Sequence, residues 1–250
     1  MAHPAPLPPT PSSPRTGARP ASPGPLAPTH PDRGRRGWAL CGAVAGPLGA
    51  VGLFGTAGIY TQEAWEAADN AEMARSVSGS TTLVWAHQAV AAVTAGLLVV
   101  FAVGLYRYLA VREPAHGLVP GVASAGVLLT AVALFLGAGL DTELWWSVRH
   151  GAAADPDTVG AMVSHYGAVP WLWGGLTLSA AAVAVAGLVR GSVGRVTATG
   201  SAVLAFLLAA TQVGPVQYIA VLPGALWLLA TGTALARHTT APKRTVGTAH

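Results

Sequence analysis

The stretch Leu83–Leu109, LVWAHQAVAAVTAGLLVVFAVGLYRYL, decides the fold class of this chain. Until its last turn it holds a single ionisable side chain, His87. An apolar run of about 18 or more residues is long enough to cross a bilayer as a helix. Lipid offers no water to backbone amide groups, so a spanning segment must satisfy them within itself. We therefore predict a transmembrane helix over Leu83–Leu109.

Five further stretches have the same character: Trp38–Tyr60, Leu118–Leu140, Val169–Val189, Val193–Gln212 and Val216–Ala236. The chain is 52% hydrophobic and only 10% charged, whereas about a quarter of the residues of a soluble domain are charged. The fold class that follows is an all-α, polytopic membrane helix bundle with six transmembrane helices. Its domains are a disordered Pro/Arg-rich cytoplasmic tail (1–37), the six-helix domain (38–237) and a short disordered cytoplasmic tail (238–250).

Basic residues concentrate in alternate gaps between the stretches. Most of the 14 Lys and Arg residues lie in the N-terminal tail, the second and fourth gaps and the C-terminal tail. Most of the 10 Asp and Glu residues lie in the two long gaps after the first and third stretches. Short loops rich in Lys and Arg remain cytoplasmic. We therefore predict a multi-pass plasma-membrane protein with both termini in the cytoplasm and two acidic outer loops.

The charge and the cysteine count exclude some functions. The formal charge of +4 follows the membrane pattern, so the lipid bilayer is the expected partner and nucleic acid is not. Cys41 is the only cysteine, which excludes an intrachain disulfide and a Cys-rich zinc site.

Small residues line the first stretch, with Gly42, Gly46 and Gly49 on its surface. Such surfaces let helix backbones approach closely in lipid. They can pack against helices of the same chain, which we favour because five other helices need partners, or they can form a homo-oligomer.

Polar residues near the predicted outer face are the candidates for a site. His87 is an ionisable group inside a spanning stretch, and such groups are expensive in lipid. The further candidate metal ligands are Asp141, Glu143, His150 and His165. Imidazoles and carboxylates bind zinc or copper, and two histidines can ligate haem. No compact HxxxH or HExxH spacing occurs, so their convergence cannot be read from the sequence, and no cofactor is predicted.

Motifs for catalysis are missing from the sequence, which has no Gly-rich phosphate loop and no nucleophile–base signature. The spans also lack Asp, Glu, Lys and Arg away from their ends, which argues against ion-coupled transport. We predict an integral membrane protein that is not an enzyme and acts through helix packing and its outer loops. The alternatives are a haem- or metal-binding redox protein using the outer histidines, and a small-solute permease.

Four features resemble a class of uncharacterised six-helix membrane proteins of actinobacteria. They are the acidic loop after the first stretch, FAVGLYRYL (Phe101–Leu109), DPDTVGAMVSHYG (Asp155–Gly167) and LVRGSVGRVTATG (Leu188–Gly200). The resemblance covers residues 38–237. It implies a fold and no chemistry.

Overall fold

A computed structural model describes residues 37–67, 69–149, 155–214 and 216–238, and within these ranges the chain is all-helical. The tails predicted at 1–37 and 238–250 lie almost wholly outside the described residues. The α-helices, in chain order, are α1 (Gly37–Thr56), α2 (Gln62–Glu66), α3 (Asn70–Ser78), α4 (Thr81–Ala110), α5 (Val119–Arg149), α6 (Pro156–Ala168), α7 (Leu176–Leu188), α8 (Arg195–Val213) and α9 (Val221–His238). Two 3₁₀ turns, η2 (Val169–Trp171) and η3 (Gln217–Ile219), precede α7 and α9.

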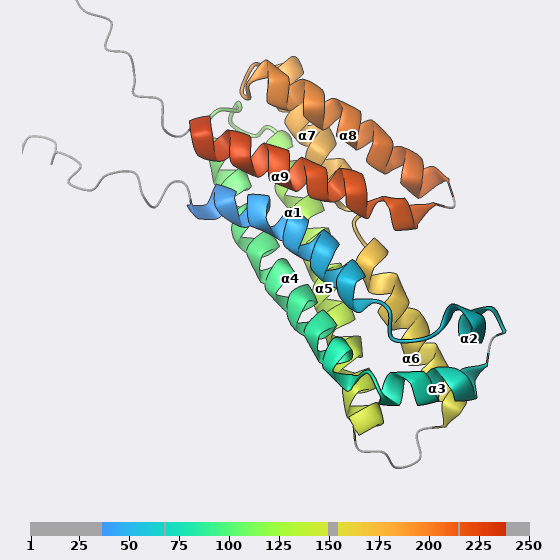
Figure 1. The fold of residues 1–250 in the computed structure, drawn as a ribbon. Helices are drawn as coiled ribbons and strands as arrows, with labels where there is room; N and C mark the ends of the chain where they lie inside the picture. The colour runs from blue at the N-terminus through green and yellow to red at the C-terminus, as the bar shows by residue number, and fades with distance from the viewer. Residues whose placement is uncertain (1–36, 68, 150–154, 215, 239–250) are drawn as a thin grey trace, which may run out of the picture. The chain divides into compact units, whose positions relative to one another are not determined.

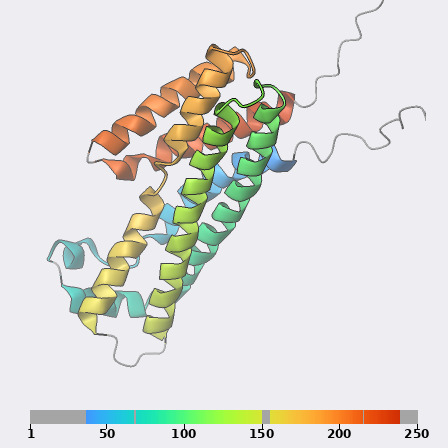
Figure 2. The same cartoon turned by 180° about the vertical axis from the view of Figure 1, so that it is seen from behind.

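Helices α4 and α5 are the longest and lie antiparallel, side by side (Figures 1 and 2). Helix α1 packs between α4 and α9, while α7 packs between α5 and α8. We call α1, α4, α5, α7, α8 and α9 the bundle. Its core is mostly Ala, Leu and Val, and its largest fully buried side chains include Trp173, Trp227 and Phe101.

Within the described ranges, five helical segments are long and apolar enough to cross a membrane, which agrees with the predicted class of protein. They cover Gly37–Thr56, Thr81–Ala110, Val119–Arg149, Arg195–Val213 and Gln217–Arg237. The helix in the fourth predicted stretch, Val169–Val189, is shorter than expected, because α7 begins only at Leu176 and has 13 residues. Pro170 has no N–H to donate to a helix. A Cβ at Gly175 would lie 2.7 Å from the Gly126 carbonyl oxygen, so the chain crosses α5 closely where the helix is interrupted.

A second group of helices forms a lobe at one end of the bundle. Helices α2, α3 and α6 make up this lobe: α3 and α6 pack on each other and on the adjoining end of α5, and α2 packs on α3 (Figure 1). The lobe has its own buried apolar cluster, which includes Met73, Val77 and Val163. The Asp155 side chain caps α6 by accepting a hydrogen bond from the Thr158 N–H, as expected for a turn residue before a helix.

The glycines of α1 contact helices of the same chain. A Cβ at Gly42 would collide with the Phe101 ring and one at Gly49 with the Trp173 ring, while at Gly46 it would meet the Ala225 carbonyl oxygen at 2.5 Å. Association between copies through this surface stays a prediction.

An ion pair joins two loops at the end of the bundle opposite the lobe. Arg190, which follows α7, donates to the Glu113 carboxylate in the loop between α4 and α5. The Glu113 side chain is fully buried, whereas the Arg190 side chain is 35% exposed. Burial disfavours the charged carboxylate, but hydrogen bonding by Ser192 and Arg190 and the Arg190 charge outweigh it and lower the pKa of Glu113.

Candidate functional site

Two of the predicted site residues meet between α4 and α5. The Nδ1 atom of His87 lies 2.7 Å from the Oδ2 atom of Asp141, and both side chains are fully buried. The tautomer with its proton on Nδ1 donates to the carboxylate, and an imidazolium would do the same. Hydrogen bonds that involve an ionised group are shorter and stronger than neutral ones.

The pair lies at the boundary between the two apolar clusters. On α4, His87 separates Val84 of the lobe cluster from Ala91 of the bundle cluster. On α5, Asp141 in the same way separates Leu144 from Ala138. Residues three and four apart share one face of a helix, so both helices place a polar residue at the same level of an otherwise apolar seam.

Tyr166, near the end of α6, covers the pair. Its ring centroid lies 4.1 Å from that of His87, with 32° between the planes. Its hydroxyl donates to the backbone carbonyl of Thr56, the last residue of α1. Burial, with a smaller contribution from Asp141, raises the pKa of Tyr166, so the phenol keeps its proton. We call His87, Asp141 and Tyr166 the junction, since they connect α1, α4, α5 and α6.

Two polar atoms of the junction have no hydrogen-bond partner among the described residues. These are Nε2 of His87 and Oδ1 of Asp141. A buried polar atom without a hydrogen bond costs about 1–3 kcal/mol, and more when it is charged. Each of these two atoms can therefore interact with one further proton, water molecule or ligand atom.

The other predicted ligands do not join the pair in the described part of the chain. Glu143 is exposed on α5. His165 is exposed on α6, and its Nδ1 lies 2.8 Å from the Ala161 carbonyl oxygen. His150 lies outside the described residues. Among the described residues no three or more His, Cys, Asp or Glu side chains gather where they could share one metal ion, and metal binding stays a prediction.

Tyr166 is the junction residue that sequence reasoning missed. It is adjacent to His165, the residue predicted as a possible ligand. Tyrosine near a predicted membrane surface is also expected there for an interfacial role alone. Its contact with Thr56 joins positions 110 residues apart. Only the period of α6 carried a signal, since Val159, Val163 and Tyr166 share one buried face.

Comparison with known proteins adds no assignment to this geometry. The chain matches no protein-family model, no curated protein and no solved structure.

Proposed function

We propose that this chain is a six-span plasma-membrane protein without enzymatic activity, in which proton binding at the junction changes how the lobe packs on the bundle. In this proposal both termini are cytoplasmic, the lobe is on the outer side, and the fourth crossing is made by α7 with the irregular segment before it. The observation that carries the proposal is the fully buried contact between His87 and Asp141 at the base of the lobe.

Helix length supports the position of the junction at the membrane surface. Helices α4 and α5 have 30 and 31 residues, which is about 45 Å each at 1.5 Å per residue. The hydrocarbon layer is only about 30 Å thick. Counted from the end of α4 opposite the lobe, His87 lies about 35 Å along the helix, so the pair falls close to the outer edge of the hydrocarbon, with the lobe beyond it.

Charge distribution supports the orientation. The loops between α4 and α5 and between α7 and α8, together with the start of α1 and the end of α9, lie at the end opposite the lobe (Figures 1 and 2). These are the gaps that hold most of the basic residues, and such loops remain cytoplasmic.

Burial explains why a proton would matter at this site. Adding or removing one proton changes the net charge of the pair by one unit, and a net charge is far more costly in a low-dielectric interior than in water. On the lobe side, Tyr166 packs directly on His87, and Tyr60 lies beside Tyr166. Burial raises the pKa of both phenols, so both keep their protons at neutral pH.

The proposal can be tested by hydrogen–deuterium exchange of the full chain in nanodiscs. Rates are corrected for intrinsic exchange from about pH 4 to about pH 9, a range that contains the ordinary pKa values of Asp and His. We expect the protection of α6 to change with pH in the native chain. That change disappears in His87→Gln and in Asp141→Asn. The matched control is His165→Gln, which removes an exposed histidine one residue from Tyr166 and keeps the change; pH dependence that survives in both junction variants refutes the proposal.

Metal or haem binding is the second candidate, because the Nε2 atom of His87 has no hydrogen-bond partner in the described part of the chain. The Tyr166 ring packs on the imidazole. In this alternative, Tyr166 moves before a metal ion or haem binds His87. Tyr166→Ala, titrated with Zn²⁺ or haem, tests this alternative: binding that appears in this variant and is lost when His87→Gln is added supports it. No observation favours a permease over these two functions.

A further inference from the structure

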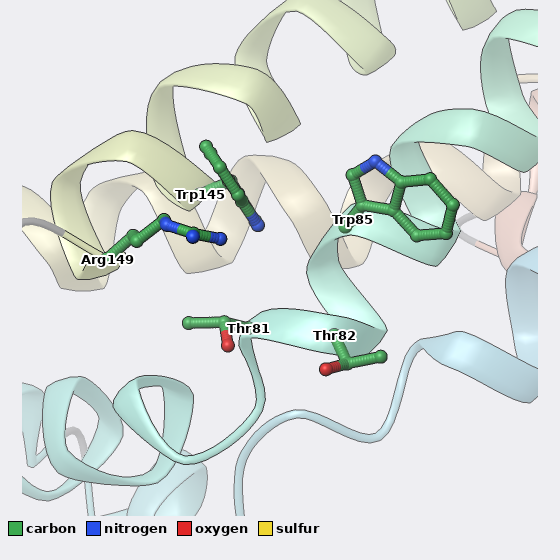
Figure 3. A pocket seen from close by; sticks show the side chains of 5 residues that line it. All are labelled: Thr81, Thr82, Trp85, Trp145 and Arg149. Atoms are coloured by element: carbon green, nitrogen blue, oxygen red, sulfur yellow. The ribbon is translucent and has the colours of Figure 1, made fainter.

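A hollow at the lobe end of α4 and α5 is separate from the junction. Its volume is about 270 Å³, and it is lined by Thr81, Thr82 and Trp85 from α4 and by Trp145 and Arg149 from α5. Figure 3 shows the Trp145 and Arg149 side chains along one wall, Trp85 on the other side, and the two threonines at the first turn of α4. Pockets for drug-sized ligands are about 300–1,000 Å³, so this hollow suits a small molecule or one headgroup.

The Arg149 guanidinium contacts an aromatic ring. It lies 4.7 Å from the centre of the Trp145 ring. No ion pair of Arg149 occurs within the described ranges, although the surrounding lobe is acidic. Stacking uses the face of the guanidinium, and its N–H groups have no partner in the part of the chain that the structure describes. Their planar arrangement matches the two oxygens of a carboxylate or phosphate.

The remaining walls suit the rest of such a ligand. The Thr81 and Thr82 hydroxyls are additional hydrogen-bond donors. Trp85 is 57% exposed, so it offers a flat apolar surface opposite Trp145 without losing packing of its own. The set therefore combines one cation, two hydroxyls and two indoles around one small space.

We propose that this hollow binds an oxyanion attached to a small apolar body, with the phosphate or carboxylate on Arg149 and the apolar part between Trp85 and Trp145. The proposal is independent of proton binding at the junction. Two sources supply this chemistry, an anionic lipid headgroup at the outer surface and a soluble organic anion, and the experiment separates them.

The test uses the full chain in phosphatidylcholine nanodiscs, titrated with phenyl phosphate and followed by calorimetry and tryptophan fluorescence. We expect saturable binding that Arg149→Gln weakens about tenfold or more, the usual effect of losing a charge-assisted hydrogen bond. Trp85→Ala, which changes an exposed side chain, weakens binding as well. In a second arm, nanodiscs containing phosphatidylglycerol compete with phenyl phosphate if lipid is a source, and leave its affinity unchanged if the ligand is soluble.

Arg75→Gln is the matched control. Arg75 is also in the lobe, but Glu72 already pairs with it at 2.6 Å, so its loss should leave binding unchanged. Equal weakening in the Arg75 and Arg149 variants would mean non-specific attraction and refute the site. Failure of the native chain to bind phenyl phosphate refutes it too.

Discussion

His87 and Asp141 lie 54 positions apart in the chain, yet their side chains form a 2.7 Å contact with no exposure to solvent. The contact stands at the level where the bundle core ends and the lobe core begins. Because each partner is buried, each depends on the other to offset its desolvation. This dependence determines what substitutions at the junction should do.

Replacing either His87 or Asp141 alone should lower the stability of the protein more than replacing both. Asp141→Leu leaves the His87 imidazole buried without a hydrogen bond, and we expect a loss of about 1–3 kcal/mol in stability. The double variant His87→Leu/Asp141→Leu should recover part of this loss, because no polar atom is then stranded. Equilibrium unfolding of the two single variants and the double variant, arranged as a double-mutant cycle, measures the coupling. Additive losses would contradict it.

Tyr166→Phe should lower the stability of the protein slightly, and Tyr166→Ala should lower it strongly. The phenylalanine keeps the ring on His87 and loses only the hydrogen bond to the Thr56 carbonyl, which is worth about 1 kcal/mol. The alanine removes a fully buried aromatic ring, which costs about 3–5 kcal/mol. It should also make His87 reactive toward an imidazole reagent such as diethylpyrocarbonate. Equal reactivity in the native chain and Tyr166→Ala would show that the ring does not protect the site.

The two residues of the ion pair at the opposite end of the bundle should differ in how much stability their substitution costs. Arg190→Gln strands the buried Glu113 carboxylate and should cost about 1–3 kcal/mol. Glu113→Gln leaves behind an arginine that is partly in water and should cost less. The pKa of Glu113 is lowered by folding, so its contribution is complete above the unfolded pKa, about 4.3. It is lost as the pH falls through the folded value. Thermal unfolding from neutral to acidic pH checks both statements, and Glu113→Gln should flatten the acid limb.

The close contact between α1 and α9 should not tolerate a methyl group at Gly232. A Cβ there would lie 2.5 Å from the Ala43 nitrogen and 2.6 Å from the Ala39 oxygen, both of them backbone atoms. The helices must therefore separate, at a cost of about 1–3 kcal/mol. Gly96→Ala is the control, since a Cβ at Gly96 meets nothing within 4 Å. Comparable unfolding midpoints for the two variants would rule out this close approach.

The proposed orientation predicts which side of the membrane each loop faces. In a Cys41→Ala background, Glu72→Cys places a thiol on α3 at a position where the native side chain is 43% exposed. Val111→Cys places one in the loop after α4, where Val111 is 79% exposed. A membrane-impermeant maleimide should label the first in intact cells and the second only after permeabilisation. Labelling of the Val111→Cys variant in intact cells would show that the orientation is the reverse of the one proposed.

The spanning helices could be predicted because their signal is local. The stretch at Leu83–Leu109 became α4, and the stretch at Leu118–Leu140 became α5, which runs nine residues further to Arg149. That extension was missed because Trp145 and Trp146 are typical of a membrane surface, where a span is expected to end. The interruption before α7 was missed because a continuous apolar run does not report where two backbones must pass closely, as Gly175 and Gly126 do.

By itself, the sequence determined that the chain forms apolar helices long enough to cross a membrane, because apolar length is a property of consecutive residues. It also marked His87, Asp141, Glu143, His150 and His165 as candidates, but it could not show which of them converge. Only the tertiary structure decided that His87 meets Asp141, that His165 faces away and that Tyr166 takes its place. The physical reason is that a site between helices depends on the rotation and depth of each helix, and these are determined by packing between segments far apart in the chain.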